Sequence, residues 1–506
     1  MRATGRAIPG DASIRRLCPL VVTLVCLALA ACVAGPNFKR PDAPHVSGYL
    51  DHPVQATVAT PDVAGGNAQR FATAAQIPAD WWTLFHSRAL DELIEQALAN
   101  NHDLKAARAA LLVARENALA QRGAFFPTLS GGLGATHQQQ SSALAPTPNN
   151  NAFAYSLFTP QLSVSYVPDV FGLNRRSLES ARAQEDAARY QMIATDLTLT
   201  TNLANAYIQE AALQEEIAAT RRQIDIEARL VEALKYQLAK GYAGGLDLAA
   251  QQTLLAQVGA TLPPLVKQAH QQADLIAVLT GRYPSEAPQQ TYALASLTLP
   301  ADLPLSLPSA LVAQRPDVLQ AQANMHDASA QVGVAAANRL PNIELTANAG
   351  STALALGQVF ASGTGFWGVG AALTQPLFDG GTLLHKERAA RAAYVQASEQ
   401  YRTTVLTAFQ NVADTLVALD QDARALRASS EALAAASATQ DLSQRQWKAG
   451  YASYLSVLGA EQADQQAQIN LVQAQAARYA DTVALFQALG GGWWGRSDLA
   501  GGKDAH

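Results

Sequence analysis

The stretch LQEEIAATRRQIDIEARLVEALKYQLAKGYA, residues 213–243, decides the fold of this 506-residue chain. Proline is absent from Asp169 to Leu262, and we predict one helix over Asn174 to Lys240. At about 1.5 Å per residue this helix is ~100 Å long, so it needs a partner along its whole length. Its apolar residues step by 4, 7, 7, 3 and 4 positions, the spacing of a coiled-coil seam, at Leu213, Ile217, Ile224, Val231, Leu234 and Leu238.

The Gly-Tyr-Ala at the end of this stretch occurs again 209 residues later, starting at Gly450. Three further pairs align in the same order: Asp103 with Asp317 and Pro127 with Pro341, both at an offset of 214, and Val170-Phe171 with Leu377-Phe378 at an offset of 207. We infer a two-fold internal repeat of about 210 residues, far longer than the units of a solenoid.

Each repeat is expected to contain a helix, a proline and two strands before the long helices. In the first repeat the helix runs from about Leu90 to Ala124. The clearest alternation of apolar and polar residues lies in the second repeat. Pro160 suggests a bulge, and Pro263-Pro264 should break the helix that returns from the first Gly-Tyr-Ala turn. The four expected strands are Leu129–His137, Phe153–Tyr166, Ile343–Ala349 and Phe366–Gln375.

Four strands of about ten residues have the length of tilted membrane strands. Open sheet edges in lipid leave backbone groups without hydrogen bonds, so a membrane sheet must close into a barrel. Known barrels begin at about eight strands, so several chains must share one: two chains give eight strands and three give twelve. The alternative is a periplasmic four-stranded sheet, or, for the helices alone, a plain coiled coil.

Residues 1–31 have the features of an export signal. Four arginines precede an apolar run from Leu20 to Ala30, which is too short to span a bilayer. The run ends in Leu29-Ala30-Ala31-Cys32, which resembles a bacterial lipobox and makes Cys32 the acylated first residue of the mature chain. Val33 stands where inner-membrane lipoproteins typically carry Asp, so this resemblance implies the outer membrane. The alternative is an ordinary signal with a chance cysteine.

The composition excludes several classes of protein. A net charge of −5 gives no basic field for nucleic acid, and past residue 31 no run of about 18 apolar residues could form a membrane helix. Only 15% of the residues are charged, and much of the 49% hydrophobic share is alanine, which suits closely packed helices. The nine histidines are scattered, and His326-Asp327 is interpreted as a packing or surface pair. We expect no enzyme, no metal and no cofactor.

Six motifs are similar to those of one family, the TolC-like outer-membrane efflux lipoproteins (NodT-type) that serve resistance–nodulation–division (RND) pumps. They cover nearly the whole mature chain in order: Gly35-Pro36-Asn37-Phe38-Lys39-Arg40-Pro41 shortly after Cys32, Trp81-Trp82-Thr83-Leu84-Phe85, Asn101-His102-Asp103-Leu104, Arg315-Pro316-Asp317-Val318, Gln375-Pro376-Leu377-Phe378-Asp379-Gly380-Gly381 and Leu489-Gly490-Gly491-Gly492-Trp493.

The resemblance implies a mostly α-helical chain with a membrane β portion. In a homotrimer, long antiparallel hairpins would form a periplasmic α-barrel, and four strands per chain would contribute to a shared twelve-stranded outer-membrane β-barrel. Such a duct would passively conduct drugs or other small molecules from an inner-membrane RND pump and a periplasmic adaptor (membrane fusion) protein to the outside. The alternatives are a duct for type I protein secretion and a non-conducting structural lipoprotein. The lipobox favours efflux.

The same resemblance assigns adaptor docking to the two helix–helix turns, although glycine at a tight turn is also what backbone geometry requires. In relatives an acidic residue often follows the second turn in a Leu-(Asp/Glu)-Ala pattern near the closed aperture, whereas this chain has Leu458-Gly459-Ala460 with Glu461 two residues later. Glu461 and Asp247 are therefore the candidate aperture acids, and Asp247 is alternatively a solvated residue at a helix start. The candidate docking residues are Gly241, Tyr242, Gly244 and Leu246 in the first turn and Gly450, Tyr451, Ser453 and Leu455 in the second.

These observations divide the chain into six segments. An extended, Pro/Ala-rich tether should reach to about Gln76, with order beginning near Trp81. The expected segments are the export signal (1–31), the lipidated tether (32–80), the first repeat (81–290), a linker (291–307), the second repeat (308–494) and a flexible C-terminal tail (495–506).

Overall fold

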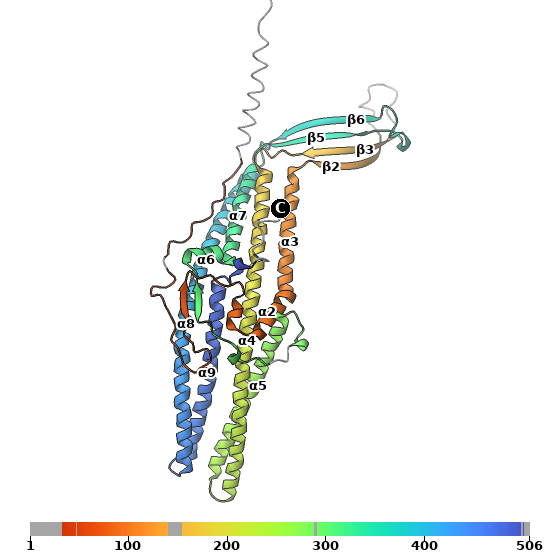
Figure 1. Cartoon of the computed structure of the whole chain (residues 1–506). Helices are drawn as coiled ribbons and strands as arrows, with labels where there is room; N and C mark the ends of the chain where they lie inside the picture. Colours follow the sequence, from red (N-terminus) through yellow and green to blue (C-terminus); the bar gives the residue numbers. More distant parts are fainter. Residues whose placement is uncertain (1–32, 47, 140–153, 288–290, 497–498, 500–506) are drawn as a thin grey trace, which may run out of the picture. The chain divides into compact units, whose positions relative to one another are not determined.

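The computed structural model describes residues 33–46, 48–139, 154–287, 291–496 and 499 (Figure 1). The export signal, Cys32, the loop 140–153 and most of the C-terminal tail lie outside the described residues. The chain divides into two compact units, of which the first takes residues up to 40, 112–186 and 322–400, and the second takes 41–111, 187–321 and 401 onward. Each unit is therefore built from both repeats.

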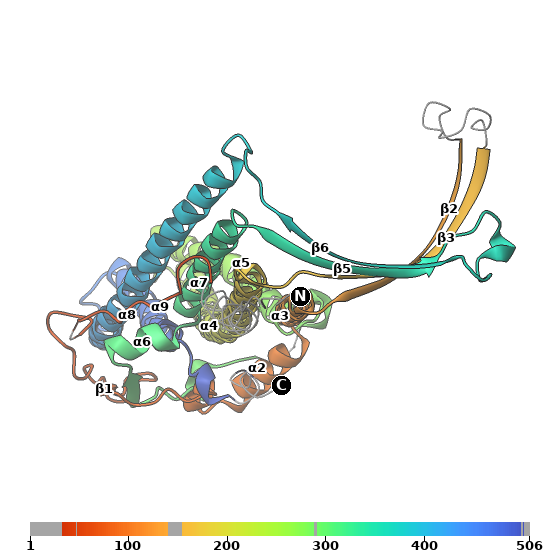
Figure 2. The same cartoon turned by 90° about the horizontal axis from the view of Figure 1, so that it is seen from above.

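The first unit contains a four-stranded antiparallel sheet, which Figure 2 shows as one long, curved ribbon. The strand order is β2–β3–β5–β6, so each repeat supplies two neighbouring strands and the repeats join through β3 and β5. Among the described residues, β2 and β6 are each paired on one side only. All four expected strands are confirmed, as Thr128–Gln139 (β2), Ala154–Tyr166 (β3), Asn342–Ser351 (β5) and Gly365–Thr374 (β6).

The register of the sheet separates an apolar face from a polar face. Leu129, Val164, Ala347 and Val369 form one row across the four strands. The next row, Ser130, Ser163, Asn348 and Gly368, faces the other way because side chains alternate along a strand. Five large side chains on the apolar face are at least two-thirds exposed: Leu129, Leu133, Trp367, Val369 and Leu373.

Pro160 lies inside β3 without the expected bulge. The pairing of β2 with β3 is continuous, and Leu133 lies opposite Pro160. The proline instead interrupts the other edge, where pairing with β5 ends at Gln161 and returns as a single bridge between Phe158 and Ala353. Because proline has no N–H to donate, the gap falls on the side where that donor is missing. The prediction of a bulge is therefore wrong.

Two long helical hairpins have the same dimensions. The helices α4 (Leu173–Ala239) and α8 (Thr382–Lys448) each have 67 residues, and α5 (Gly245–Leu279) and α9 (Tyr454–Ala488) each have 35. The predicted helix over Asn174 to Lys240 is confirmed to within one residue at each end. In the second unit the α4–α5 and α8–α9 turns lie at the same end, the lower one in Figure 1. The equal lengths support the inferred duplication.

The helix α5 runs unbroken through Pro263 and Pro264, so the predicted break is wrong. A proline inside a helix removes one hydrogen bond and crowds the preceding turn, and either effect can be absorbed as a bend. Residues on both sides of the two prolines pack against α4: Leu262, Leu265 and Val266 contact the cluster of Leu213, Ile217 and Ala269. This packing holds the helix together where local sequence alone favours an end.

The helix expected from Leu90 to about Ala124 is divided at Asn101 into α2 (Arg88–Asn100) and α3 (His102–Arg122). The Asn101 side chain accepts a hydrogen bond of 2.9 Å from the Leu104 N–H and donates one of 3.0 Å to the Leu279 carbonyl. Asparagine favours such caps over helix interiors. The second repeat breaks at the equivalent position, Arg315, between α6 (Pro308–Gln314) and α7 (Pro316–Ala337).

The expectation that order begins near Trp81 is also wrong. The strand β1 (Arg70–Thr73) pairs in parallel with β4 (Asp302–Leu305), so the tether and the linker form a small sheet in the second unit. Next to it, Gln69 is fully buried and donates a hydrogen bond of 3.0 Å to the Thr482 hydroxyl. That partner lies 413 positions away along the chain, so it leaves no local signal in the sequence.

The remaining elements are short. Trp81 opens the 3₁₀ helix η1 (Trp81–Phe85), is buried, and stacks on Phe486 of α9 with ring centroids 5.2 Å apart. No helix in the described parts of the chain combines the length and apolarity needed to cross a membrane. The other 3₁₀ turns are η2 (Gly123–Phe125), η4 (Pro284–Glu286), η5 (Leu294–Ser296), η6 (Leu356–Gln358) and η7 (Trp493–Gly495).

Candidate functional site

The two hairpin turns of the second unit have the same backbone conformation. Gly241 and Gly450 have φ of 79° and 80°. The N–H of Tyr242 bonds the Gln237 carbonyl, and the N–H of Tyr451 bonds the Gln446 carbonyl, each at 2.9 Å. A glycine with positive φ, followed by a hydrogen bond that reaches back five positions along the chain, is the Schellman motif at the C-terminus of a helix. The turn glycines are therefore required by backbone geometry.

Four large side chains project from these turns. Tyr242 is 83% exposed and Leu246 81%, and their counterparts Tyr451 and Leu455 are 87% and 69% exposed. Gly244 and Ser453 are the residues just before α5 and α9. The two turns thus present the same pair of exposed tyrosine and leucine side chains. We call these four side chains the tip residues.

Behind the tip residues the two hairpins pack against each other. Leu234, Leu254 and Val258 come from the first hairpin, and Tyr454, Val457 and Leu458 from the second; we call these six residues the tip core. The Tyr454 hydroxyl donates a hydrogen bond of 2.5 Å to Oε1 of Gln251 on α5, and the amide of Gln251 donates to Glu227 on α4. A polar network therefore crosses from one hairpin to the other beside the tip core.

The two candidate aperture acids have different environments. Asp247 accepts a hydrogen bond of 3.2 Å from the Gly244 N–H, which places it as a helix-start residue of α5. Glu461 is 1% exposed within the single chain and accepts a hydrogen bond of 3.3 Å from Gln444 of α8. Burial first, and then the negative charge of Glu227, raise the pKa of Glu461 to about 7. The structure brings Glu461 together with Glu227, a residue that none of the sequence motifs includes.

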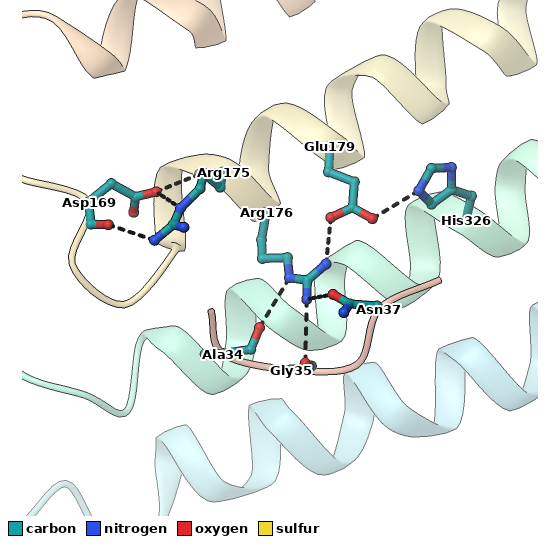
Figure 3. A network of polar contacts seen from close by, with 8 residues as sticks. All are labelled: Ala34, Gly35, Asn37, Asp169, Arg175, Arg176, Glu179 and His326. Atoms are coloured by element: carbon teal, nitrogen blue, oxygen red, sulfur yellow. Dashed lines mark hydrogen bonds and ion pairs between the residues drawn. The ribbon is translucent and has the colours of Figure 1, made fainter. Parts of the chain in front are cut away.

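A second polar centre lies in the first unit, where α4 begins (Figure 3). The guanidinium of Arg176, with 4% of its side chain exposed, donates to the carbonyls of Ala34 (3.1 Å) and Gly35 (3.4 Å) and to Oδ1 of Asn37 (2.7 Å). It also pairs with Glu179 at 2.6 Å. We call this arrangement the Arg176 clamp, because it fixes the segment that directly follows Cys32 in sequence.

The Arg176 clamp explains the Gly-Pro-Asn-Phe part of the first family motif. Gly35 has φ of 84°, and a Cβ there would lie 2.4 Å from the Cα of Gly333 on α7, so only glycine fits. Phe38 stacks on His326 with ring centroids 4.3 Å apart, and Nε2 of His326 contacts Glu179 at 2.9 Å. Asp327 instead accepts a hydrogen bond of 2.6 Å from Ser180. His326 and Asp327 thus have different partners.

Sequence reasoning did not find Arg176, Glu227 or Gln251. Each is one charged or amide residue among many on a long helix, and each has at least one partner on another element. The spacing of Glu227 one heptad before Leu234 was a usable signal, since it places an acid on the apolar seam. Within the described residues, no group of three or more His, Cys, Asp or Glu side chains is placed to hold a metal ion.

Comparison with known proteins assigns both repeats to the same family. The family model described as "Outer membrane efflux protein" matches residues 93–282 and 307–491. The chain is 32% identical over 424 residues to the pyoverdine export outer membrane protein OpmQ of Pseudomonas aeruginosa, covering 83% of this chain and 88% of that protein. It is 27% identical to the toluene efflux pump outer membrane protein TtgC of Pseudomonas putida, covering 95% and 97%. A solved structure of the outer-membrane channel OprN superimposes with a TM-score of 0.81 at 25% identity, covering 91% of this chain and 100% of that chain.

Proposed function

The chain belongs to the outer membrane efflux protein family and is the outer-membrane channel of an efflux system, and we propose that three copies form the exit duct of a tripartite pump. The single observation that carries this proposal is the four-stranded sheet, whose two outer strands have no second partner among the described residues and whose apolar face is exposed. In lipid such edges must pair. Three chains would supply twelve strands, and the paired hairpins would form the wall of the periplasmic tunnel.

The proposed duct conducts passively. Its partners are a periplasmic adaptor protein and an inner-membrane RND transporter, which supplies the energy. The tip residues support adaptor docking, because large apolar side chains that stay exposed on a chain of this kind mark a contact with another protein. Their repetition in both hairpins would let one adaptor surface meet both turns. Asp247 serves as a helix-start residue in this proposal.

The proposed anchor is lipid on Cys32. The Arg176 clamp supports it, since the residues that follow Cys32 are fixed to the first unit, which also carries the sheet. Stable anchoring takes more than one acyl chain, as a lipobox cysteine would provide. Replacing Cys32→Ser should abolish incorporation of labelled palmitate, and continued incorporation in that variant would refute the lipid anchor.

For the cargo we propose a polar, siderophore-like small molecule. The support is the identity of 32% to the pyoverdine export protein, against 27% and 30% to two toluene efflux pump proteins. A deletion strain tested against a panel of siderophores, solvents and antibiotics distinguishes these classes. Retention of a siderophore inside the cells supports the proposal, whereas sensitivity to toluene alone would contradict it.

Single-channel recording in planar bilayers tests the duct itself. Purified trimers should conduct once the tips are loosened, for example by truncating Leu254 and Leu458 of the tip core to alanine. A trimer that never conducts, even with these substitutions, would favour the non-conducting structural lipoprotein. Export of a protein substrate in place of small molecules would favour type I secretion.

A further inference from the structure

Two glutamates are buried beside the tip core. Glu227 on α4 is 0% exposed and Glu461 on α9 is 1% exposed. Glu227 lies one heptad before Leu234 and Glu461 one heptad after Tyr454, so both occupy the seams along which the hairpins pack. Nearly complete burial of two carboxyl groups is strongly unfavourable if both are charged. Burial of both groups therefore favours a state in which one of the two carboxyl groups holds a proton.

The hydrogen bonds of the two carboxyl groups are unequal. Both amides next to Glu227, those of Gln223 and Gln251, donate to its carboxylate. Oε1 of Glu461 accepts one hydrogen bond of 3.3 Å from Gln444, and its buried Oε2 has no hydrogen-bond partner among the described residues. Burial raises the pKa of both carboxyl groups, but the two donors counter this shift at Glu227, so Glu461 is better suited to carry a proton.

Groups on all four helices face this pair. The negative charge of Glu227 on α4 acts on Glu461. From α8, the neutral amide of Gln444 donates a hydrogen bond to Glu461. From α5, Gln251 bridges Glu227 to Tyr454. Burial, followed by the charges of Glu461, Glu227 and Asp247, raises the pKa of the Tyr454 hydroxyl, which stays protonated. The charged groups acting within the network are therefore all acidic.

We propose that Glu227 and Glu461 form a proton-operated latch, in which one proton held on Glu461 keeps the two hairpins together and its release drives them apart. With the proton bound, one charge is buried and is hydrogen-bonded. Without it, two negative charges lie in the same buried seam, and separation of the hairpins lets water reach both. The consequence that the periplasmic aperture opens rests on the proposed function as a duct, whereas the movement of the hairpins does not.

The sign of the pH dependence follows from the direction of the shift. The pKa of Glu461 is raised from 4.5 to about 7 in the closed arrangement. An acid with a raised pKa contributes its full stabilisation of the closed arrangement below 4.5 and loses it as the pH rises to about 7. Within this window, each pH unit changes the ratio of closed to open hairpins by up to about tenfold. Acid therefore closes the latch.

The test measures the separation of the hairpins directly. Tyr236 on α4 and Leu442 on α8 are both exposed, and the sequence has no cysteine after Cys32, so spin labels on Tyr236→Cys and Leu442→Cys report one distance within a protomer. Full-length trimers with one labelled protomer among unlabelled ones are measured by pulsed dipolar spectroscopy from pH 5 to 8, with EDTA present to exclude a divalent cation. The label-to-label distance should lengthen as the pH rises.

Two variants and a control decide the outcome. Glu461→Gln, whose amide can donate to Glu227, should keep the pH 5 distance up to pH 8, and Glu227→Gln should move the midpoint to lower pH. Glu232→Gln, at an exposed acid of α4 paired with Lys235, should leave the wild-type profile unchanged. A wild-type distance that is constant with pH, or a full pH response in Glu461→Gln, would overturn the latch. Hairpins that separate in a trimer that never conducts would instead refute the duct and leave the latch standing.

Discussion

The hydroxyl of Tyr454 on α9 donates a 2.5 Å hydrogen bond to Oε1 of Gln251 on α5. Both side chains are buried, and Gln251 is fully enclosed. This bond joins the two hairpins beside the tip core, where the ring of Tyr454 also packs on Trp447 with centroids 5.0 Å apart. The contact therefore combines apolar packing, which has no direction, with a directed bond that fixes how the hairpins are aligned.

Replacing Tyr454→Phe should loosen the hairpins and keep their packing. The substitution retains the ring and leaves the buried oxygen of Gln251 without its donor, a loss of about 1–3 kcal/mol. We expect the open probability of single channels to rise about tenfold, since about 1.4 kcal/mol corresponds to that factor. Tyr451→Phe, at an exposed hydroxyl of the neighbouring turn, is the matched control. Equal open probabilities in the two variants would show that the bond does not hold the hairpins.

Replacing Gly450→Val should distort the second turn and weaken adaptor docking. No atom lies within 4 Å of a Cβ at this position, so the effect comes from the positive φ alone. A β-branched residue is a genuine outlier in the left-handed region, and such strain costs about 1–3 kcal/mol. We expect photo-crosslinking from Leu455 to the adaptor to fall several-fold. Asparagine tolerates the left-handed backbone conformation, so Gly450→Asn should retain the crosslinking to the adaptor.

A second control for the turn is Gly459→Val, because Gly459 lies within α9 and also has open space around its Cβ position. It should leave the crosslinking yield near the wild-type level. If Gly450→Val crosslinks as well as Gly459→Val, the turn conformation is not needed for docking.

Replacing Arg176→Ala should release the segment 33–38 from the first unit. Three of its hydrogen bonds go to that segment, and bonds to a charged group contribute about 1.5–3 kcal/mol each. We expect trypsin to cut between the exposed Lys39 and Arg40 at least tenfold faster, followed by mass spectrometry. Arg175→Ala is the control, since Arg175 bonds to Asp169 and not to the N-terminal segment. Similar cleavage rates in both variants would contradict the clamp.

Much of the fold follows from local patterns in the sequence. The heptad steps, the long stretch without proline and the repeated Gly-Tyr-Ala predict α4 and α8 because a helix of this length must repeat its apolar residues along one seam. The alternation from Ile343 predicts β5 because side chains change faces at every residue of a strand. The heptad steps and the alternation depend only on neighbours in the chain.

The errors and omissions share one cause, which is contact between distant residues. α5 passes through Pro263 because residues around it pack on Leu213 and Ile217. β1 forms because β4 lies beside it, more than 200 positions later. Glu461 was selected as an aperture acid from its place after the turn, but its burial depends on α4 and α8. The Arg176 clamp likewise depends on partners about 140 positions away.

Replacing Asp481→Asn on α9 should stabilise the chain at neutral pH and not in acid. Burial first, then the charge of Asp422 on α8 and a side-chain hydrogen bond with it, raise the pKa of Asp481 from 3.8 to about 7. A raised pKa means that the folded state gains stability from the proton, fully below 3.8, and loses this gain as the pH rises to about 7. At pH 7.5 the asparagine avoids the repulsion and can still donate to Asp422.

Asp481 is partly exposed, so solvent screening reduces the effect to about 1 kcal/mol. We therefore expect the Tm of the variant to exceed that of the wild type by about 1–3 °C at pH 7.5, with the difference vanishing near pH 4. Scanning calorimetry across this range provides the measurement. Asp414→Asn, at an exposed acid of the same helix as Asp422, controls for the loss of one charge. If the difference in Tm between the variant and the wild type were the same at all pH values, Asp481 would not hold the extra proton. Only a group that titrates between pH 4 and 7.5 can make the two Tm values converge in acid.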